Sequence, residues 1–265
     1  MKTPVLLLVF GLSMFIYMTN AQDAKTIMKH YQTNAKIDYL TSEIEYNNHS
    51  KKGRVQNRKL KQFIKRRPET VDCYKLLLQF VAPGDVKGTA TLTLQNDEKN
   101  DQQWLYLPAL RGTKQISPSR RTNRFMGTEM TYEDLNNYLS EPLEKRNYKL
   151  LKEEAVNGIN CYVIEAIPST AKEKQTSGYS KRHLWISQEN YSNIKTVFYN
   201  KSGEKYKIYE AFDINKVGNS TLYRPSKIIM KNLKTGNWTE VFYRNMQVNE
   251  MIEDNLFTVA YLENN

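Results

Sequence analysis

The stretch Trp104-Leu105-Tyr106-Leu107-Pro108-Ala109-Leu110 places apolar side chains on both faces of one extended segment. Residues 89–94 behave differently, because threonine alternates there with alanine or leucine. A half-buried strand alternates with a period of two, whereas a strand that is covered on both faces does not. We therefore expect the strand that begins at Trp104 to have core on one face. The other face meets either a cavity or covering helices.

The segments around this strand also indicate a sheet. Runs of β-branched and aromatic residues with a period of two recur along the chain, and glycine- or proline-containing turns separate them. In one run Tyr206, Ile208 and Phe212 share a face, opposite Lys205 and Lys207. Roughly ten strands at this short spacing predict a meandering antiparallel sheet.

Two short helices are expected beside the sheet. Thr131 and Asp134 have the spacing of a helix-start motif in which each side chain bonds a free backbone N–H. Another helix opens the fold, because apolar residues recur there at helical spacing: Ala24, Ile27, Met28, Tyr31 and Ala35. The fold class is therefore mainly β (α+β), with helices on the concave side of one sheet. The chain lacks a long linker or an internal repeat, so we expect one domain over residues 22–265.

The N-terminal residues are expected to direct export. Lys2 precedes an apolar run over residues 4–18, and the small residue Ala21 ends it. This is the pattern of a secretory signal peptide that is cleaved after residue 21. The alternative is an uncleaved anchor, but the run is shorter than the ~20 apolar residues that span a bilayer. We expect an exported protein of the periplasm that is soluble after cleavage.

The chain is basic, with 39 Lys and Arg against 28 Asp and Glu and a net charge of +11. Two basic runs, over residues 51–67 and 111–124, carry this excess. They are either solvated strand faces or a rim that attracts anionic headgroups or an acidic partner. Arg120, Arg121 and Arg124 are the candidate rim. Because an exported protein rarely meets nucleic acid, we expect no nucleic-acid partner.

The sequence offers little catalytic chemistry. Its three histidines lack the spacing of metal ligands, and neither a nucleophile elbow nor a phosphate-binding loop occurs. We expect no catalytic residues, metal or cofactor. Glu129, Glu133 and Asp134 are the remaining candidates for paired carboxylates that cleave a glycan, with Glu129 or Glu133 as the acid. The simpler interpretation is that these acids stabilise the start of a helix.

Cys73 and Cys161 are the only two cysteines. An oxidising compartment would allow one bridge between them. Both fall inside predicted strands, where a free cysteine packs as a small apolar residue. Either state is compatible with the sequence.

Two motifs carry a family resemblance. The first is the run from Trp104 to Arg111, and the second is Phe125-Met126-Gly127-Thr128-Glu129-Met130-Thr131-Tyr132-Glu133-Asp134-Leu135. They resemble the W-x-Y-x-P and F-M-G-T/S-D-x-S/T-Y-E-D-L motifs of the outer-membrane lipoprotein-sorting (LolA-like) proteins of Gram-negative bacteria. Glu129 stands where that family usually has Asp, and Gly112-Thr113 stand where basic or β-branched residues are common. The resemblance covers nearly all of the mature chain.

This resemblance implies an incomplete, curved antiparallel β-barrel whose open side is covered by short helices. It implies a cavity that takes the acyl chains of a lipid or lipoprotein and carries them toward the outer membrane without catalysis. The implied partners are an inner-membrane transporter and an outer-membrane acceptor, with transient contact at the membrane surface and a monomeric protein. No catalytic residue carries over from the family.

The candidate lipid-binding residues are large apolar groups in or near the two motifs: Trp104, Tyr106, Phe125, Met126, Met130 and Trp185. Leu105 and Leu107 are the alternative set if the strand presents its other face. Under the first choice, Trp104→Ala lowers lipid affinity and leaves the fold intact. Two rival functions stay open, namely a structural or interaction module without a ligand, and an envelope glycan-acting enzyme.

Overall fold

A computed structural model of the chain describes residues 23–70, 73–96, 101–139 and 141–264. The expected signal peptide, residues 1–21, lies outside the described residues. Among the residues that the structure describes, no helix has both the length and the apolar character needed to cross a membrane.

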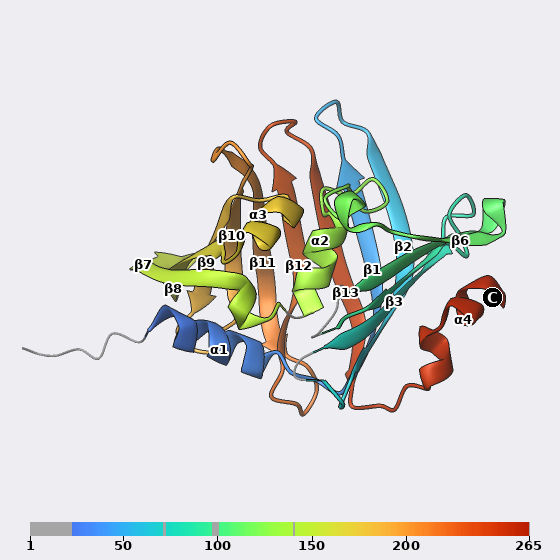
Figure 1. The fold of residues 1–265 in the computed structure, drawn as a ribbon, viewed down its shortest axis with the longest axis horizontal. Helices are drawn as coiled ribbons and strands as arrows, with labels where there is room; N and C mark the ends of the chain where they lie inside the picture. Colours follow the sequence, from blue (N-terminus) through green and yellow to red (C-terminus); the bar gives the residue numbers. More distant parts are fainter. Residues whose placement is uncertain (1–22, 71–72, 97–100, 140, 265) are drawn as a thin grey trace, which may run out of the picture.

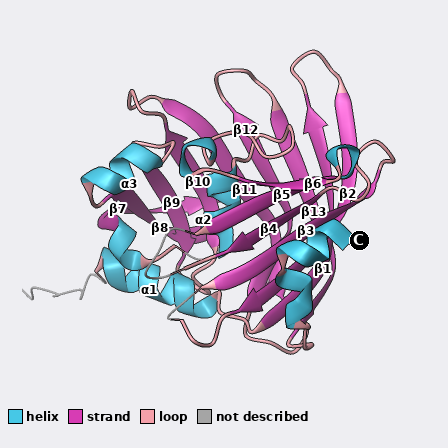
Figure 2. Cartoon of the chain, turned by 45° about the vertical axis from the view of Figure 1, so that its right-hand side comes forward, coloured by secondary structure: helices cyan, strands magenta, loops and turns pink. Residues whose placement is uncertain are grey.

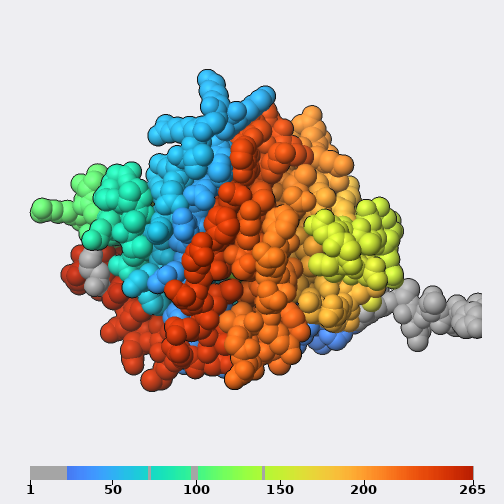
Figure 3. All heavy atoms as spheres, turned by 180° about the vertical axis from the view of Figure 1, so that it is seen from behind, coloured from blue at the N-terminus to red at the C-terminus, as the bar shows by residue number. Residues whose placement is uncertain are grey.

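The described residues form one antiparallel sheet of thirteen strands in the order β6-β5-β4-β3-β2-β1-β13-β12-β11-β10-β9-β8-β7. The first and last strands therefore meet in the middle of the sheet, where Ile44 pairs with Tyr243. Figure 3 shows this seam from behind, with the blue N-terminal strands beside the red C-terminal ones. β6 and β7 are the two edges, so the sheet is an open half-barrel, as expected.

The strands are β1 (Tyr39–His49), β2 (Val55–Arg66), β3 (Tyr74–Ala82), β4 (Ala90–Leu94), β5 (Gln102–Leu107), β6 (Gly112–Gln115), β7 (Arg146–Val156), β8 (Ile159–Pro168), β9 (Lys181–Ser187), β10 (Asn193–Tyr199), β11 (Lys205–Lys216), β12 (Tyr223–Asn232) and β13 (Trp238–Val248). The α-helices are α1 (Ala24–Asn34), α2 (Tyr132–Leu139), α3 (Ala171–Thr176) and α4 (Val259–Asn264). Four short 3₁₀ helices are η1 (Pro108–Leu110), η2 (Pro118–Arg120), η3 (Leu143–Lys145) and η4 (Asp254–Phe257).

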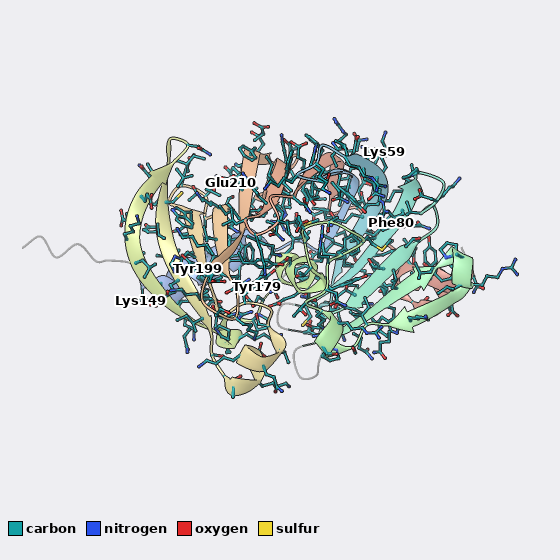
Figure 4. The ribbon with its side chains drawn as sticks, turned by 90° about the horizontal axis from the view of Figure 1, so that it is seen from above. Lys59, Phe80, Lys149, Tyr179, Tyr199 and Glu210 are labelled. Carbon is teal, nitrogen blue, oxygen red and sulfur yellow. The ribbon has the colours of Figure 1, made fainter. Side chains whose placement is uncertain are left out.

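One connection crosses the open side of the half-barrel. β6 and β7 follow each other in sequence but occupy opposite edges, so the chain between them must pass over the concave face. This connection contains α2, which lies in front of the sheet in Figure 1 and inside its curve in Figure 4. Figure 4 also shows Phe80 and Tyr179 toward the inside and Lys59 and Lys149 on the outer surface.

Both expected helices form, for local reasons. α1 begins after Asp23, whose carboxylate accepts hydrogen bonds from the backbone N–H groups of Lys25 and Thr26. α2 begins at the predicted motif: the Asp134 N–H donates to Thr131 Oγ1 at 3.1 Å, and the Thr131 N–H donates to Asp134 Oδ2 at 2.8 Å. Each pair satisfies N–H groups that the first helical turn leaves unbonded.

The buried apolar side chains form three clusters. The largest fills the concave side beneath α2, and the second joins α1 to β8 and β9. The third lies on the opposite face of β3, β4 and β5, where η4 and α4 cover it. Alternate residues of β3 divide between the two faces, since Leu76 and Leu78 join the first cluster and Leu77 the third. This end of the sheet is therefore covered on both sides.

β11 carries a lysine on its concave side. Lys207, Tyr209 and Ala211 point to that side, and Tyr206 packs against the same cluster. Lys207 is only 1% exposed. The sequence alone does not reveal this burial, because lysine is almost always a surface residue.

The two cysteines are free and buried. Cys161 is on β8, and its thiol donates to the Ile159 carbonyl oxygen at 3.4 Å. Burial raises the pKa of this thiol to about 11. It therefore packs as a neutral, unreactive group, and the bridge left open by the sequence is absent from the described residues.

Candidate ligand cavity

A cavity of about 170 Å³ lies between the concave face of the sheet and α2. Its deep part is lined by buried apolar side chains from β1–β3, β12 and β13 and from the segment before α2: Ile44, Leu60, Leu76, Leu78, Phe125, Met130, Ile228, Met230 and Val241. Leu135 and Tyr138 of α2 form its roof. Such a surface favours apolar groups that leave water.

The other end of the cavity is polar and reaches solvent. It is bordered by the end of α1, the turn between β9 and β10, and the start of β12: Gln32, Asn34, Ala35, Lys36, Asn190, Ser192, Asn193, Tyr223 and Arg224. Asn34 and Lys36 are exposed, in contrast to the deep lining. The cavity therefore has an apolar depth and a hydrophilic mouth, which suits an amphipathic ligand.

A buried ion pair fixes the roof. Lys207 Nζ on β11 lies 2.6 Å from Asp134 Oδ2 on α2 and donates to the Glu129 carbonyl oxygen at 3.1 Å. The Tyr179 hydroxyl donates to Asp134 Oδ1 at 2.8 Å, and the Tyr179 ring centre lies 5.0 Å from the ammonium group. A charge this deeply buried requires a partner of opposite sign, so α2 is held over the sheet at this point.

A second charged cluster lies at the wall of the cavity beyond α2. Glu141 contacts Arg182 of β9 and Arg146 of β7, and its Oε1 is 2.7 Å from an Arg146 guanidinium nitrogen. Burial alone would raise the pKa of Glu141, but the two guanidinium groups outweigh it and lower the pKa to about 2. The cluster joins the end of the crossing connection to the β7 edge.

Comparison with known proteins identifies the fold. A family model whose description ends in "-like: Uncharacterized protein" matches residues 72–264. A Vibrio parahaemolyticus domain assigned to outer membrane lipoprotein sorting is 28% identical and superposes with a TM-score of 0.83, over 91% of this chain and 98% of that one. The chain belongs to the LolA-like family.

Two further LolA-like structures share the architecture. A DUF1329 family protein from Desulfovibrio piger is 23% identical with a TM-score of 0.84, covering 90% of this chain and 97% of its own. A LolA superfamily protein from Nitrosomonas europaea is 20% identical with a TM-score of 0.69, and the match covers 91% of this chain and 100% of that one. At these identities the likeness shows the fold alone. Comparison with curated sequences gives no match.

The structure separates the candidate lining residues of this LolA-like chain. Phe125 and Met130 line the deep part of the cavity, and Met126 packs beside it. Trp104 and Tyr106 lie outside the cavity, because their face of β5 packs against η4 and α4. This part of the predicted lining is corrected: Leu105, from the alternative set, is the β5 residue that packs on the concave side.

Trp185 also lies outside the cavity. Arg182 and Leu184 of β9 face the lining, so the period of two turns Trp185 to the other face of the sheet. There its Nε1 donates to Glu154 Oε2 at 3.3 Å, and Lys195 Nζ lies 5.4 Å from its ring centre.

The predicted arginine rim does not border the mouth. Arg124 contacts the Glu129 carboxylate and donates to the Thr128 carbonyl oxygen at 2.9 Å. Arg121 donates to the Asp101 carbonyl oxygen, and Arg120 is exposed in η2. These contacts hold the connection between β6 and α2 in shape. The mouth lies instead at the end of α1.

Both acids of the rival glycan-cleaving hypothesis are engaged within the fold. Glu129 is 2% exposed and accepts a hydrogen bond from Asn232 Nδ2 at 2.8 Å. Glu133 accepts from Ser177 Oγ at 2.5 Å and from the Gly178 N–H at 2.7 Å, and burial raises its pKa. Among the described residues, no group of three or more His, Cys, Asp or Glu side chains is placed to hold a metal ion.

Sequence reasoning missed a group of tyrosines around the mouth: Tyr31, Tyr138, Tyr209 and Tyr243. The rings of Tyr138 and Tyr243 stack with their centres 6.2 Å apart. They come from α1, α2, β11 and β13, so their convergence is tertiary. The only available signal was the count of 18 tyrosines.

The Lys207–Asp134 pair predicts strong coupling between sheet and roof. Lys207→Met and Asp134→Asn should each destabilise the protein by about 3–5 kcal/mol, because each leaves one buried charge without its partner. The double variant should cost less than the sum of the two, as measured by urea unfolding in a double-mutant cycle. The exposed Lys205 gives the control Lys205→Met, which we expect to change stability little. Additive losses would contradict the assigned coupling.

Glu141 predicts an acid-sensitive contribution to stability. Because its pKa in the folded protein is lowered to about 2, the stabilisation is complete above pH 4.5 and is lost as the pH falls toward 2. The difference in Tm between wild type and Glu141→Gln should therefore be large at neutral pH and shrink across this window. Glu144→Gln, at an exposed neighbouring position, is the control. A pH-independent difference would contradict this assignment.

Proposed function

We propose that the protein is a non-catalytic periplasmic carrier that holds the acyl chain of a lipid or lipoprotein and takes it toward the outer membrane. The observation that carries this proposal is the cavity itself, with an apolar depth enclosed by α2 and a polar mouth. The lipoprotein-sorting assignment of the Vibrio parahaemolyticus relative also supports a carrier function.

The physical basis is transfer out of water. Each methylene group gains about 0.8 kcal/mol when it leaves water, so a free acyl chain crosses an aqueous gap very slowly. The cavity of about 170 Å³ is smaller than the ~300–1,000 Å³ typical of ligand sites. A full acyl chain therefore requires α2 to move away from the sheet, a movement that separates Lys207 from Asp134 and is opposed by that pair. Loading and release then correspond to two positions of α2 whose populations the ligand shifts.

The carrier cycle needs a donor and an acceptor. We propose an inner-membrane transporter as the donor, an outer-membrane acceptor, and a monomeric carrier that touches each membrane surface transiently. The basic outer face of β2, which includes the exposed Lys59 and Lys61, favours contact with anionic surfaces. The rival is a module without a ligand, whose concave side would take up nothing.

The deciding experiment is native mass spectrometry of protein purified from its periplasm, followed by lipid extraction. We expect a fraction of the protein to carry an added mass that extraction identifies as an acylated compound. An apo mass that persists after incubation with lipids would favour the rival module.

A cavity-filling variant tests where the chain binds. Leu78→Trp should fill the deep part and lower acyl-chain uptake at least tenfold, at a stability cost of about 1–3 kcal/mol. Displacement of Nile red by dodecanoate measures uptake, and a cooperative urea transition confirms folding. The matched control is Trp104→Ala, which we now expect to leave uptake unchanged because Trp104 packs against η4 and α4. The reverse pattern would move the binding site to the Trp104 face.

A further inference from the structure

We propose that Arg224 makes the mouth of the cavity a receptor for an anionic group at the end of the bound acyl chain. The ligand class is a single chain that ends in a carboxylate or a phosphate. This inference rests on the proposed carrier function and narrows it. Arg224 is near the start of β12 and is one of the residues that line the mouth.

The guanidinium group of Arg224 has no counter-ion in the part of the chain that the structure describes. Among the described residues, no carboxylate oxygen lies within 4.0 Å of it. Its Nε is buried and without a hydrogen-bond partner, and its Nη2 donates only a long bond of 3.4 Å to the Ala35 carbonyl oxygen. Arg182, the other arginine of the lining, is paired with Glu141. Of the two arginines of the lining, Arg224 is thus the one without a carboxylate partner among the described residues.

Aromatic groups surround this charge. The Arg224 guanidinium carbon lies 5.5 Å from the centre of the Tyr138 ring, a cation–π distance. Tyr31, Tyr209 and Tyr243 all lie within its electrostatic range, and burial keeps their pKa values raised. These phenols are neutral at physiological pH, so their O–H groups remain able to donate hydrogen bonds. The mouth therefore combines one positive charge with several neutral donors.

This arrangement fits an anion better than it fits a neutral headgroup. A partly desolvated guanidinium without a counter-ion is unfavourable, and a ligand anion would remove that cost. The planar fork of arginine also matches a carboxylate or phosphate through two parallel hydrogen bonds. The apolar, deep part of the cavity would hold the acyl chain while Arg224 binds the anionic group.

The sheet is open beside this position. β12 pairs with β13 over Lys227 to Lys231 only, so in the described pairing Arg224 has a strand neighbour on one side, at Asn215 of β11. Tyr243 of β13 lines the same cavity but pairs with β1. The β12–β13 ladder thus stops short of Arg224.

The test compares three ligands that share one twelve-carbon chain: dodecanoate, dodecyl phosphate and dodecanol. Displacement of Nile red, a neutral dye, gives the affinity of each for wild type, Arg224→Gln, Arg224→Lys and Arg244→Gln. Arg244 is the matched control, since its side chain is 63% exposed on β13. Two anionic ligands are included because carboxylate and phosphate share the recognition chemistry, and their relative affinities identify which source the site prefers.

We expect wild type to bind both anionic ligands more tightly than dodecanol. Arg224→Gln should weaken the anionic ligands roughly tenfold to a hundredfold and leave dodecanol within about threefold. Arg224→Lys should keep the preference for anions at reduced affinity, and Arg244→Gln should match wild type. Retained dodecanol binding shows that the cavity of Arg224→Gln is intact. If that variant does not fold, Arg224→Lys carries the test.

Three results would overturn the inference. Equal affinity of wild type for all three ligands would remove the anion preference while leaving the carrier function in place. An equal loss for all three in Arg224→Gln, or unchanged anion affinity in both Arg224 variants, would also do so. If no ligand displaces the dye from wild type, the carrier function itself fails, and this inference fails with it.

Discussion

A buried ammonium group determines where the roof of the cavity lies. Lys207 projects from a strand well inside the sheet into apolar surroundings, where an unpaired charge is prohibitively unfavourable. Asp134 of α2 neutralises it, and the Glu129 carbonyl oxygen and the Tyr179 ring complete its surroundings. The distance between helix and sheet, and hence the depth of the cavity beneath, follows from this pairing. A leucine at position 207 would pack α2 without specifying its position.

The topology explains why a helix is there at all. Because β6 and β7 are the two edges of the sheet, the chain between them has to traverse the open side. A polar loop could not do so over an apolar surface without leaving backbone groups unsatisfied. A capped helix satisfies them internally, and its apolar residues Leu135 and Tyr138 face the cavity. The same segment thus closes the half-barrel and forms the movable part of the proposed carrier.

Local signals in the sequence predicted local structure well. The capping motif at Thr131 and the helical spacing from Ala24 gave both helices, and the period of two gave an open antiparallel meander. Faces were harder to predict. The side of β5 that bears Trp104 packs against η4 and α4, about 150 residues later in the chain, and nothing near Trp104 signals that contact. The burial of Lys207 could not be predicted for the same reason, since its partner Asp134 is on another element.

The candidate site residues show the same difference between local and long-range signals. Phe125 and Met130 were identified because they flank the helix motif, whereas Arg224 and its tyrosines come from five separate elements. The arginines at 121 and 124 were conspicuous as a cluster in the sequence, yet they support the crossing connection. Charged residues that are close in the sequence therefore do not predict a site whose residues come from separate elements of a curved sheet.

The pairing of β1 with β13 also sets the order in which the molecule can assemble. β1–β6 and β7–β13 are each a series of neighbouring hairpins, which form from nearby contacts, but the seam between the two halves joins residues about 200 positions apart. Until the last strand has emerged, β1 is an open edge of eleven residues, able to pair with any other exposed strand. Such a chain cannot complete its sheet while β13 is still being synthesised or translocated. The exposed edge of β1 must therefore be kept from pairing with other strands until β13 is available.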